Sequence, residues 1–206
     1  MTTRSRRTSS LGPTTTDVYP VVLRLAGRRC LVVGGGQVAQ RKVEGLVAAG
    51  AEVTVVAPEV EAELATLAGV TVEERAYRAG EVADYWLVIA ATDDPAVQQA
   101  VFDDGERAGV WVNAADEPAR CSFYLPAVHR RPPVSVAVST GGTSPALAAW
   151  LRDRLAEALP DELEEMSAVL AAERAELQAA GVRTDGRDWT VRIDRLLAEL
   201  EARRSP

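Results

Sequence analysis

Cysteine and histidine are scarce in this chain of 206 residues. It has two cysteines, Cys30 and Cys121, and one histidine, His129. These numbers exclude a disulfide framework and any cysteine and histidine cluster of zinc or iron–sulfur spacing. Chemistry is therefore expected from carboxylates, hydroxyls or a bound cofactor. The cysteines are interpreted as small core residues, and His129 either packs under a loop or takes part in catalysis.

Positive charge and long apolar runs are also limited. Lysine and arginine total 23 against 30 acidic residues, a net charge of -7, which disfavours nucleic-acid binding and means that an anionic ligand needs local cations. No apolar run approaches the roughly 20 residues that cross a bilayer. We therefore expect a cytoplasmic protein with no membrane partner. Residues 1–17 are expected to be a disordered tail, although their basic, hydroxyl-rich composition also fits a transit peptide.

Short β-branched runs alternate with longer segments rich in Ala, Gln, Glu and Arg from Tyr19 to about Val112. This alternation predicts repeated βαβ units, hence an α/β fold with a Rossmann-like, doubly wound parallel sheet. Three of the runs are apolar at consecutive positions, as expected where helices cover both faces of a sheet. The expected strands are Leu31–Val33, Val53–Val56, Val70–Val72, Leu87–Ile89 and Val110–Val112.

The composition changes after Asp116. Two further extended segments are expected, Phe123–Leu125 and Val134–Val138, followed by a helix over Ala146–Leu159 and two more helices whose leucine stripes are interpreted as core packing. Since two extended segments are marginal alone, a homodimer is expected. The predicted organisation is a tail (1–17), a Rossmann domain (18–125), a small α+β dimerisation region (126–160) and a helical C-terminal segment (161–206).

A glycine-rich turn follows the first expected strand. The run from Gly34 to Ala39 has the pattern G-x-G-x-x-A and leads into a helix. Gly34 permits a tight turn, Gly36 lets the backbone approach a pyrophosphate, and Ala39 lets the helix pack closely. Because phosphates bind well at helix N-termini, this context favours nucleotide binding over a plain strand-to-helix turn.

The end of the second expected strand bears on cofactor choice. Rossmann folds place an acidic residue there for the adenosine ribose, and here Glu59 follows Pro58. No lysine or arginine occurs in residues 58–63 to receive a 2'-phosphate. NAD is therefore preferred over NADP, with Glu59 in the ribose role.

Polar candidates follow later strands. Asp116 comes after the fifth strand, where parallel sheets build active sites, and is either a general base or a turn-forming residue. Asp94, after the fourth strand, is interpreted as a helix cap before Pro95. The run Ser139–Pro145 either binds ligand carboxylates through backbone N–H groups or is a capped turn with Ser144 as N-cap. Five arginines nearby either bind a polycarboxylate or form a solvated face: Arg120, Arg130, Arg131, Arg152 and Arg154.

Six sequence blocks in order resemble those of a known family. The blocks are Val32–Lys42, Val53–Pro58, Ile89–Asp93, Val112–Asp116, Cys121–Ala127 and Ser139–Pro145. Over about residues 18–160 the chain resembles the precorrin-2 dehydrogenase and sirohydrochlorin ferrochelatase family, the NAD-dependent part of sirohaem synthase. The resemblance implies homodimers that oxidise precorrin-2 to sirohydrochlorin with NAD, many of which also insert Fe²⁺, a substrate, to give sirohaem.

The resemblance also implies residue roles. The essential carboxylate of the family falls on Asp116, and no residue is assigned to a resident metal. The expected cofactor-binding residues are Gly34, Gly36, Gln37, Val38, Pro58, Glu59 and Thr92. The residues expected to bind the tetrapyrrole polycarboxylate are Asn113, Arg120, Arg131, Ser139, Thr140, Gly141 and Ser144.

The match has two departures. Thr140 stands where some members carry a serine linked to phosphorylation, and Pro132 stands where glycine is frequent. No methyltransferase segment follows, so methylation is expected from another protein.

Two alternative functions stay open: a dehydrogenase served by a separate chelatase, and a non-enzymatic NAD-sensing Rossmann module. The sensor would have no need of Asp116 or of the blocks between Cys121 and Pro145.

Overall fold

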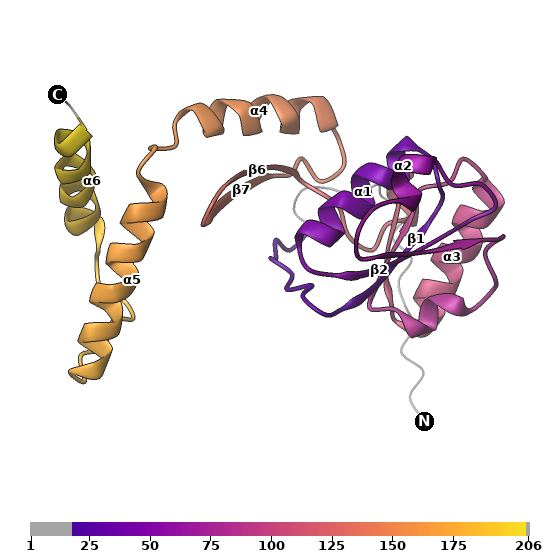
Figure 1. The fold of residues 1–206 in the computed structure, drawn as a ribbon, viewed down its shortest axis with the longest axis horizontal. Helices are drawn as coiled ribbons and strands as arrows, with labels where there is room; N and C mark the ends of the chain where they lie inside the picture. The colour runs from indigo at the N-terminus through magenta and orange to yellow at the C-terminus, as the bar shows by residue number, and fades with distance from the viewer. Residues whose placement is uncertain (1–17, 205–206) are drawn as a thin grey trace. The chain divides into compact units, whose positions relative to one another are not determined.

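A computed structural model describes residues 18–204 of the protein (Figure 1). The chain divides into two compact units, one ending at Leu125 and the other beginning at Pro126. The tail expected over residues 1–17 lies outside the described residues. No helix in the described part of the chain is long and apolar enough to cross a membrane.

The first unit is built on one parallel sheet. Its strand order is β3-β2-β1-β4-β5, which confirms the expected α/β fold class. The chain passes from β1 to one edge of the sheet and then returns to the other side of β1, so the carboxyl ends of β1 and β4 flank the switch point where such sheets bind ligands. The strands are β1 (Arg29–Val33), β2 (Glu52–Ala57), β3 (Val70–Glu74), β4 (Leu87–Ala90) and β5 (Trp111–Ala114).

Helices cover both faces of this sheet (Figure 1). On one face Cys30 and Val32 of β1 share a buried cluster with Ala39 and Val43 of α1 (Gln37–Ala48). On the other face Leu31 and Val33 share a cluster with Val101 of α3 (Pro95–Ala108). Successive residues of a strand point to opposite faces, so an uninterrupted apolar run supplies both clusters. The short elements are α2 (Ala62–Ala65) and the 3₁₀ turns η2 (Glu81–Asp84) and η3 (Pro118–Arg120).

Helix α3 has the N-terminal cap that the sequence indicates. The side chain of Asp94 accepts hydrogen bonds from the backbone N–H groups of Ala96 (2.8 Å) and Val97 (3.3 Å), and Pro95 follows it. The helix ends at Gly109, whose φ of 72° lies in the left-handed region. Asp94 is therefore accounted for by its cap, as expected.

The second unit contains a hairpin and three helices. Strands β6 (Ala127–Arg131) and β7 (Val134–Val138) pair antiparallel, and helix α4 (Pro145–Glu157) packs on them. Helices α5 (Leu163–Ala179) and α6 (Thr190–Arg204) follow and share a small core.

The prediction of an extended segment over Phe123–Leu125 is wrong, because the strand spans Ala127–Arg131. Side chains rather than a strand ladder hold the earlier residues. Ser122 exchanges hydrogen bonds with the backbone of Val112, and the carbonyl of Phe123 accepts one from the Asn113 amide. The Phe123 ring meanwhile packs on the core of the first unit.

The interpretation of the leucine stripes of α5 and α6 as core packing is correct, whereas α4 leaves large apolar side chains exposed. Met166, Leu196 and Leu200 are buried together. In α4 the buried residue is Ala148. The side chains of Leu147, Trp150 and Leu155 are 48%, 55% and 47% exposed.

Candidate cofactor and substrate site

Two glycines fit the β1–α1 turn between neighbouring strand ends. Gly34 has a φ of 128°, and a Cβ on it would lie 2.1 Å from the carbonyl oxygen of Ala91 after β4. A Cβ on Gly35 would lie 2.1 Å from the carbonyl oxygen of Glu59 after β2. Gly34 therefore has the turn role expected of it. The packing role of Gly35 escaped sequence reasoning, although the run of three glycines signals it.

Gly36 differs from its two neighbours. It precedes α1 with a φ of -89°, and a Cβ on it would meet no atom within 4 Å. The fold therefore does not require glycine there. No side chain caps α1, and Gly36 and Gln37 are exposed. The residues present therefore fit a dinucleotide, since a pyrophosphate would approach the backbone at Gly36 and accept from N–H groups of the first turn, including that of Val38.

The end of β2 lies beside this turn. Pro58 and Glu59 are exposed, and the N–H of Glu61 donates to the carbonyl of Gly35 (2.9 Å). The N–H of Arg75 donates to the carbonyl of Ala57 (2.9 Å), which brings a cation after β3 to the same strand end. Residue spacing along the chain could not reveal Arg75, because it comes near β2 only through the pairing of β2 with β3.

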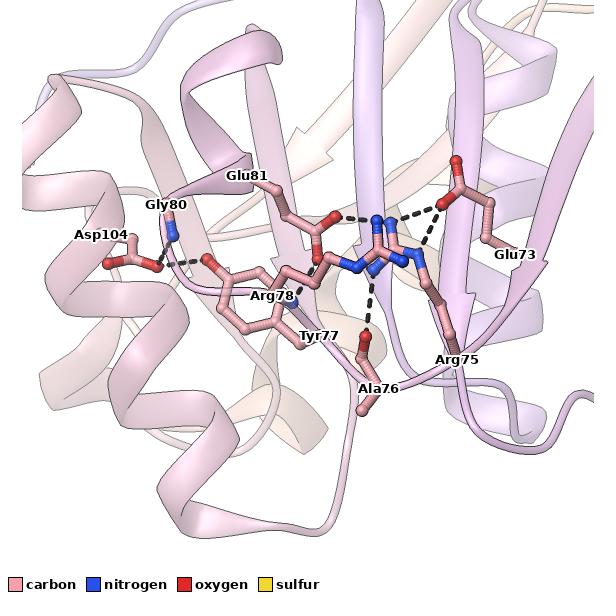
Figure 2. A network of polar contacts seen from close by, with 8 residues as sticks. All are labelled: Glu73, Arg75, Ala76, Tyr77, Arg78, Gly80, Glu81 and Asp104. Carbon is pink, nitrogen blue, oxygen red and sulfur yellow. Dashed lines mark hydrogen bonds and ion pairs between the residues drawn. The ribbon is translucent and has the colours of Figure 1, made fainter.

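The charge of Arg75 is already matched by two carboxylates (Figure 2). Its Nη2 lies 2.6 Å from Oε2 of Glu81, and its Nε lies 2.7 Å from Oε2 of Glu73. The hydrogen bond to Glu81 is the largest cause that raises the pKa of Arg75 above its ordinary value. This cation is therefore engaged inside the protein and not left for a 2'-phosphate.

A buried carboxylate fixes the next part of the connection between β3 and β4. Both the Tyr77 hydroxyl and the Gly80 N–H donate to Oδ2 of Asp104 at 2.6 Å, and Arg107 pairs with the same carboxylate (Figure 2 shows the first two contacts). Burial alone would raise the pKa of Asp104, but these hydrogen bonds and the charge of Arg107 lower it. Burial and Asp104 raise the pKa of Tyr77. The network ties this connection to α3.

Asp116 follows β5 in an unusual backbone conformation. Its φ is 61°, the one positive value at a residue other than glycine in residues 18–204, and its side chain is exposed. The N–H of Ala115 donates to the carbonyl of Ala90 (2.8 Å), which holds this turn against the end of β4. Left-handed conformations cost free energy except in residues such as Gly, Asn and Asp, and such strain clusters at functional sites.

Thr92 lies at the neighbouring end of β4. Its carbonyl accepts a hydrogen bond from Nε2 of Gln98 (2.7 Å), and its hydroxyl oxygen accepts one from the N–H of Asp94 (3.3 Å). The first unit therefore gathers the Gly34–Val38 turn, Pro58, Glu59, Thr92 and Asp116 at the carboxyl edge of its sheet.

Two residues expected to bind substrate have internal partners. Asn113 is buried, and its amide donates to the carbonyl of Phe123 (3.0 Å) and to Sγ of Cys121 (3.4 Å). Arg120 donates through Nε to Gln99 (2.8 Å) and through Nη1 to Gln98 (3.3 Å). These contacts give both residues a structural role, and their substrate-binding role stays a prediction.

Cys30 is buried and Cys121 is half-buried. Burial raises the pKa of Cys30 to about 11, and burial also raises that of Cys121. A raised thiol pKa lowers the thiolate fraction, and the thiolate is the nucleophile. The environments therefore agree with the interpretation of both cysteines as packing residues.

In the second unit, the expected carboxylate-binding turn is closed by its own hydroxyls. Oγ1 of Thr140 accepts from the N–H of Ser144 and donates to the Ser144 carbonyl, both at 3.0 Å. Ser139 accepts from the N–H of Gly141 (3.2 Å), and Ser144 caps α4 by accepting from the N–H of Leu147 (3.3 Å). The capped turn is present, while ligand binding here and modification of Thr140 stay predictions.

Arg131 and His129 lie on β6 of the same unit. Nη1 of Arg131 donates to the carbonyls of Leu159 (2.7 Å) and Pro160 (3.1 Å) and pairs with Asp161 (3.0 Å). The buried Nε2 of His129 has no hydrogen-bond partner among the described residues. Arg131 therefore links β6 to the segment after α4, and its substrate-binding role stays a prediction.

The doubly wound sheet, the glycine turn at its switch point and the uncapped N-terminus of α1 define a dinucleotide-binding protein of the Rossmann type. Comparisons with known families agree: the family described as putative NAD(P)-binding matches residues 21–127, and the one described as sirohaem biosynthesis protein central matches residues 131–158. The chain belongs to the putative NAD(P)-binding family, and the two matches together confirm the resemblance to the NAD-dependent part of sirohaem synthase seen in the sequence.

Individual relatives are consistent with this membership. The chain is 40% identical over 185 residues to a siroheme synthase of Nitrosococcus oceani, covering 87% of this chain and 40% of that protein. It is 45% identical over 148 residues to a siroheme synthase of Tolumonas auensis, covering 71% and 32%. The chain thus spans less than half the length of these relatives. The solved structure of SirC, described as a precorrin-2 dehydrogenase, matches with a TM-score of 0.65 and 28% identity over 89% of each chain.

Proposed function

We propose that this protein oxidises precorrin-2 to sirohydrochlorin with NAD. The observation that carries the proposal is the carboxylate of Asp116, exposed after β5 at the same sheet edge as the open backbone of Gly36. Bound NAD would supply the hydride acceptor. Asp116 would accept the proton that leaves the substrate with the hydride, so that two electrons and two protons are removed in all.

The preference for NAD over NADP has support from charge. Glu59 is an exposed acid after β2, where the adenosine ribose binds in Rossmann folds. A 2'-phosphate there would face Glu59, while the neighbouring Arg75 is held by Glu73 and Glu81. Calorimetric titration should show tighter binding of NAD, and equal or tighter binding of NADP would contradict the assignment.

The same carboxylate suits insertion of Fe²⁺, which would be a second substrate of the protein. Metallation of sirohydrochlorin removes two pyrrole N–H protons, and Asp116 could accept them in turn. The match to a sirohaem biosynthesis family and the similarity to siroheme synthases support this extension. Dehydrogenation alone, with a separate chelatase, is the competing proposal.

We also propose a homodimer assembled through the second unit. A two-stranded hairpin is marginal alone, and α4 leaves Leu147, Trp150 and Leu155 exposed beside it. Large apolar side chains left exposed at a surface are candidates for burial in a protein interface. Light scattering should give about twice the chain mass of 22.0 kDa.

One assay tests these activities together. The purified protein is incubated with precorrin-2 and NAD, with and without Fe²⁺ or Co²⁺, and the tetrapyrrole absorbance is followed. Sirohydrochlorin formed without metal supports the dehydrogenase, and sirohaem formed faster than in a protein-free control supports the chelatase. NAD binding with no tetrapyrrole turnover would overturn the enzyme assignment in favour of an NAD sensor.

A further inference from the structure

Lys42 stands apart from the other cations of this protein. It is the one lysine among 206 residues, whereas arginine occurs 22 times. Arginine serves the ion pairs of the described chain, including those made by Arg75, Arg131 and Arg192. A compact ammonium and a planar guanidinium are not interchangeable in binding sites. The surroundings of Lys42 are therefore expected to differ from those of the arginines.

The position of Lys42 on α1 directs it toward the sheet edge described above. It lies four residues after Val38 and three after Ala39, so all three residues share one side of the helix. Side chains on a helix lean toward its N-terminus. The four-carbon stem of Lys42 therefore leads back toward the carboxyl edge of the sheet, where the glycine turn and Asp116 lie.

The electrostatic surroundings agree with this direction. Lys42 is half-buried, and burial, followed by the charge of Arg41, lowers the pKa of its ammonium, whereas Asp116 and Cys121 raise it. Asp116 and Cys121 both come from the segment after β5, so this segment acts electrostatically on the ammonium.

The charge of Asp116 acts on the Lys42 ammonium, but these two side chains of the described chain do not form an ion pair. No hydrogen bond or ion pair joins the ammonium to a side chain in the part of the chain that the structure describes. A half-buried ammonium without a partner costs folding free energy, since it gives up water without gaining an anion. At the same edge Arg75 and Arg120 are engaged by other side chains of the protein. Lys42 is thus a cation at the site that is not committed to an internal partner.

We propose that Lys42 binds one carboxylate of the tetrapyrrole and so positions the substrate beside Asp116. This inference rests on the function proposed above and adds a substrate-binding residue to it. A substrate rich in carboxylates needs local cations in a protein of net charge -7. Lys42 supplies one at the sheet edge that carries Asp116, and the bound carboxylate would in turn neutralise the ammonium.

The test compares Lys42→Met, which keeps the length of the side chain and removes its charge, with Lys42→Arg and the control Arg41→Met. Arg41 is the exposed neighbouring cation on the same helix. For each variant, sirohydrochlorin binding is titrated without NAD, NAD binding is measured by calorimetry, and KM and kcat for precorrin-2 are determined. Thermal unfolding checks the fold.

In Lys42→Met we expect sirohydrochlorin affinity to fall and KM for precorrin-2 to rise by about tenfold or more, because a charge-assisted contact is lost. The value of kcat should change much less, NAD affinity should hold, and the melting temperature should not fall. Lys42→Arg should recover part of the affinity, and Arg41→Met should resemble the wild type.

Three results for Lys42→Met would overturn the proposal. The first is an unchanged KM and an unchanged sirohydrochlorin affinity. The second is a loss confined to kcat, which would mean that Lys42 acts through Asp116, and the third is weakened NAD binding, which would make Lys42 a phosphate ligand. Failure of the proposed function is a separate result, because the wild-type protein itself would then fail to bind or oxidise the tetrapyrrole.

Discussion

The two units of this protein bury their apolar residues to very different extents. In the first unit both faces of the sheet carry large buried clusters, with strands such as Leu87–Ala90 buried throughout. Among the described residues of the second unit, the buried apolar side chains are Ala148, Met166, Leu196 and Leu200. The first unit therefore has the core of a self-sufficient domain, whereas the second has apolar surface suited to a partner. Variants in each unit can test this difference.

The largest effect is expected at Asp116 in the first unit. Asp116→Asn should reduce dehydrogenation by roughly 10²- to 10⁴-fold, because the amide keeps the shape of the side chain and removes the base. Asparagine also tolerates the φ of 61°, so the fold should survive. Steady-state kinetics measure the effect, with NAD binding as the control. Near-normal turnover would remove Asp116 from catalysis.

The glycine turn offers a matched pair of variants. Gly34→Ala should destabilise the first unit by about 2 kcal/mol or more, since the new Cβ would meet the Ala91 carbonyl. Gly36→Val should leave the melting temperature nearly unchanged, because space at Gly36 is open, yet weaken NAD binding by about tenfold or more, roughly 1.4 kcal/mol. Thermal unfolding and calorimetry separate the two effects. Normal NAD binding in Gly36→Val would show that the turn has been misinterpreted.

In the second unit, substitutions of exposed apolar residues should affect dimer formation. Trp150→Glu should weaken the proposed dimer by about 2 kcal/mol or more, since a large aromatic side chain at an interface is replaced by a charge. Light scattering over a concentration series would follow the shift to monomer, and NAD binding should persist. A wild-type protein that is monomeric and fully active would disprove the dimer.

A smaller effect is expected in the network around Asp104. Tyr77→Phe should cost about 1 to 2 kcal/mol of stability, because it removes the hydroxyl that donates to a buried carboxylate. The pKa of Asp104 is lower in the folded state than in the unfolded chain. Its contribution is therefore present above the unfolded pKa and is lost as pH falls through the folded pKa.

Denaturant unfolding at neutral and acidic pH checks this expectation. The difference between wild type and Tyr77→Phe should shrink as the carboxyl of Asp104 becomes protonated. A difference that does not change with pH would mean that the Tyr77 hydroxyl contributes through packing and not through the charge of Asp104.

Much of the first unit was predictable because its signals are local. Consecutive apolar residues gave the buried strands, and Asp94 before Pro95 gave a helix cap. Phe123–Leu125 was mistaken for a strand because contacts with Asn113 and Val112, distant in sequence, outweigh its β propensity. The exposure of Leu147 and Leu155 could not be read from the sequence, because helical periodicity marks an apolar face without saying what covers it.

The amino-acid sequence by itself determined the α/β class, the glycine turn, the helix caps and the family, since each depends on residues close together in the chain or on ordered blocks. Tertiary structure alone decided the rest. It showed that Arg75 lies beside the end of β2 but is held by two carboxylates, that Gly36 opens onto free space, and that Arg120 and Arg131 have internal partners. Whether a charge is available to a ligand depends on neighbours brought from elsewhere in the chain, and local sequence carries no record of them.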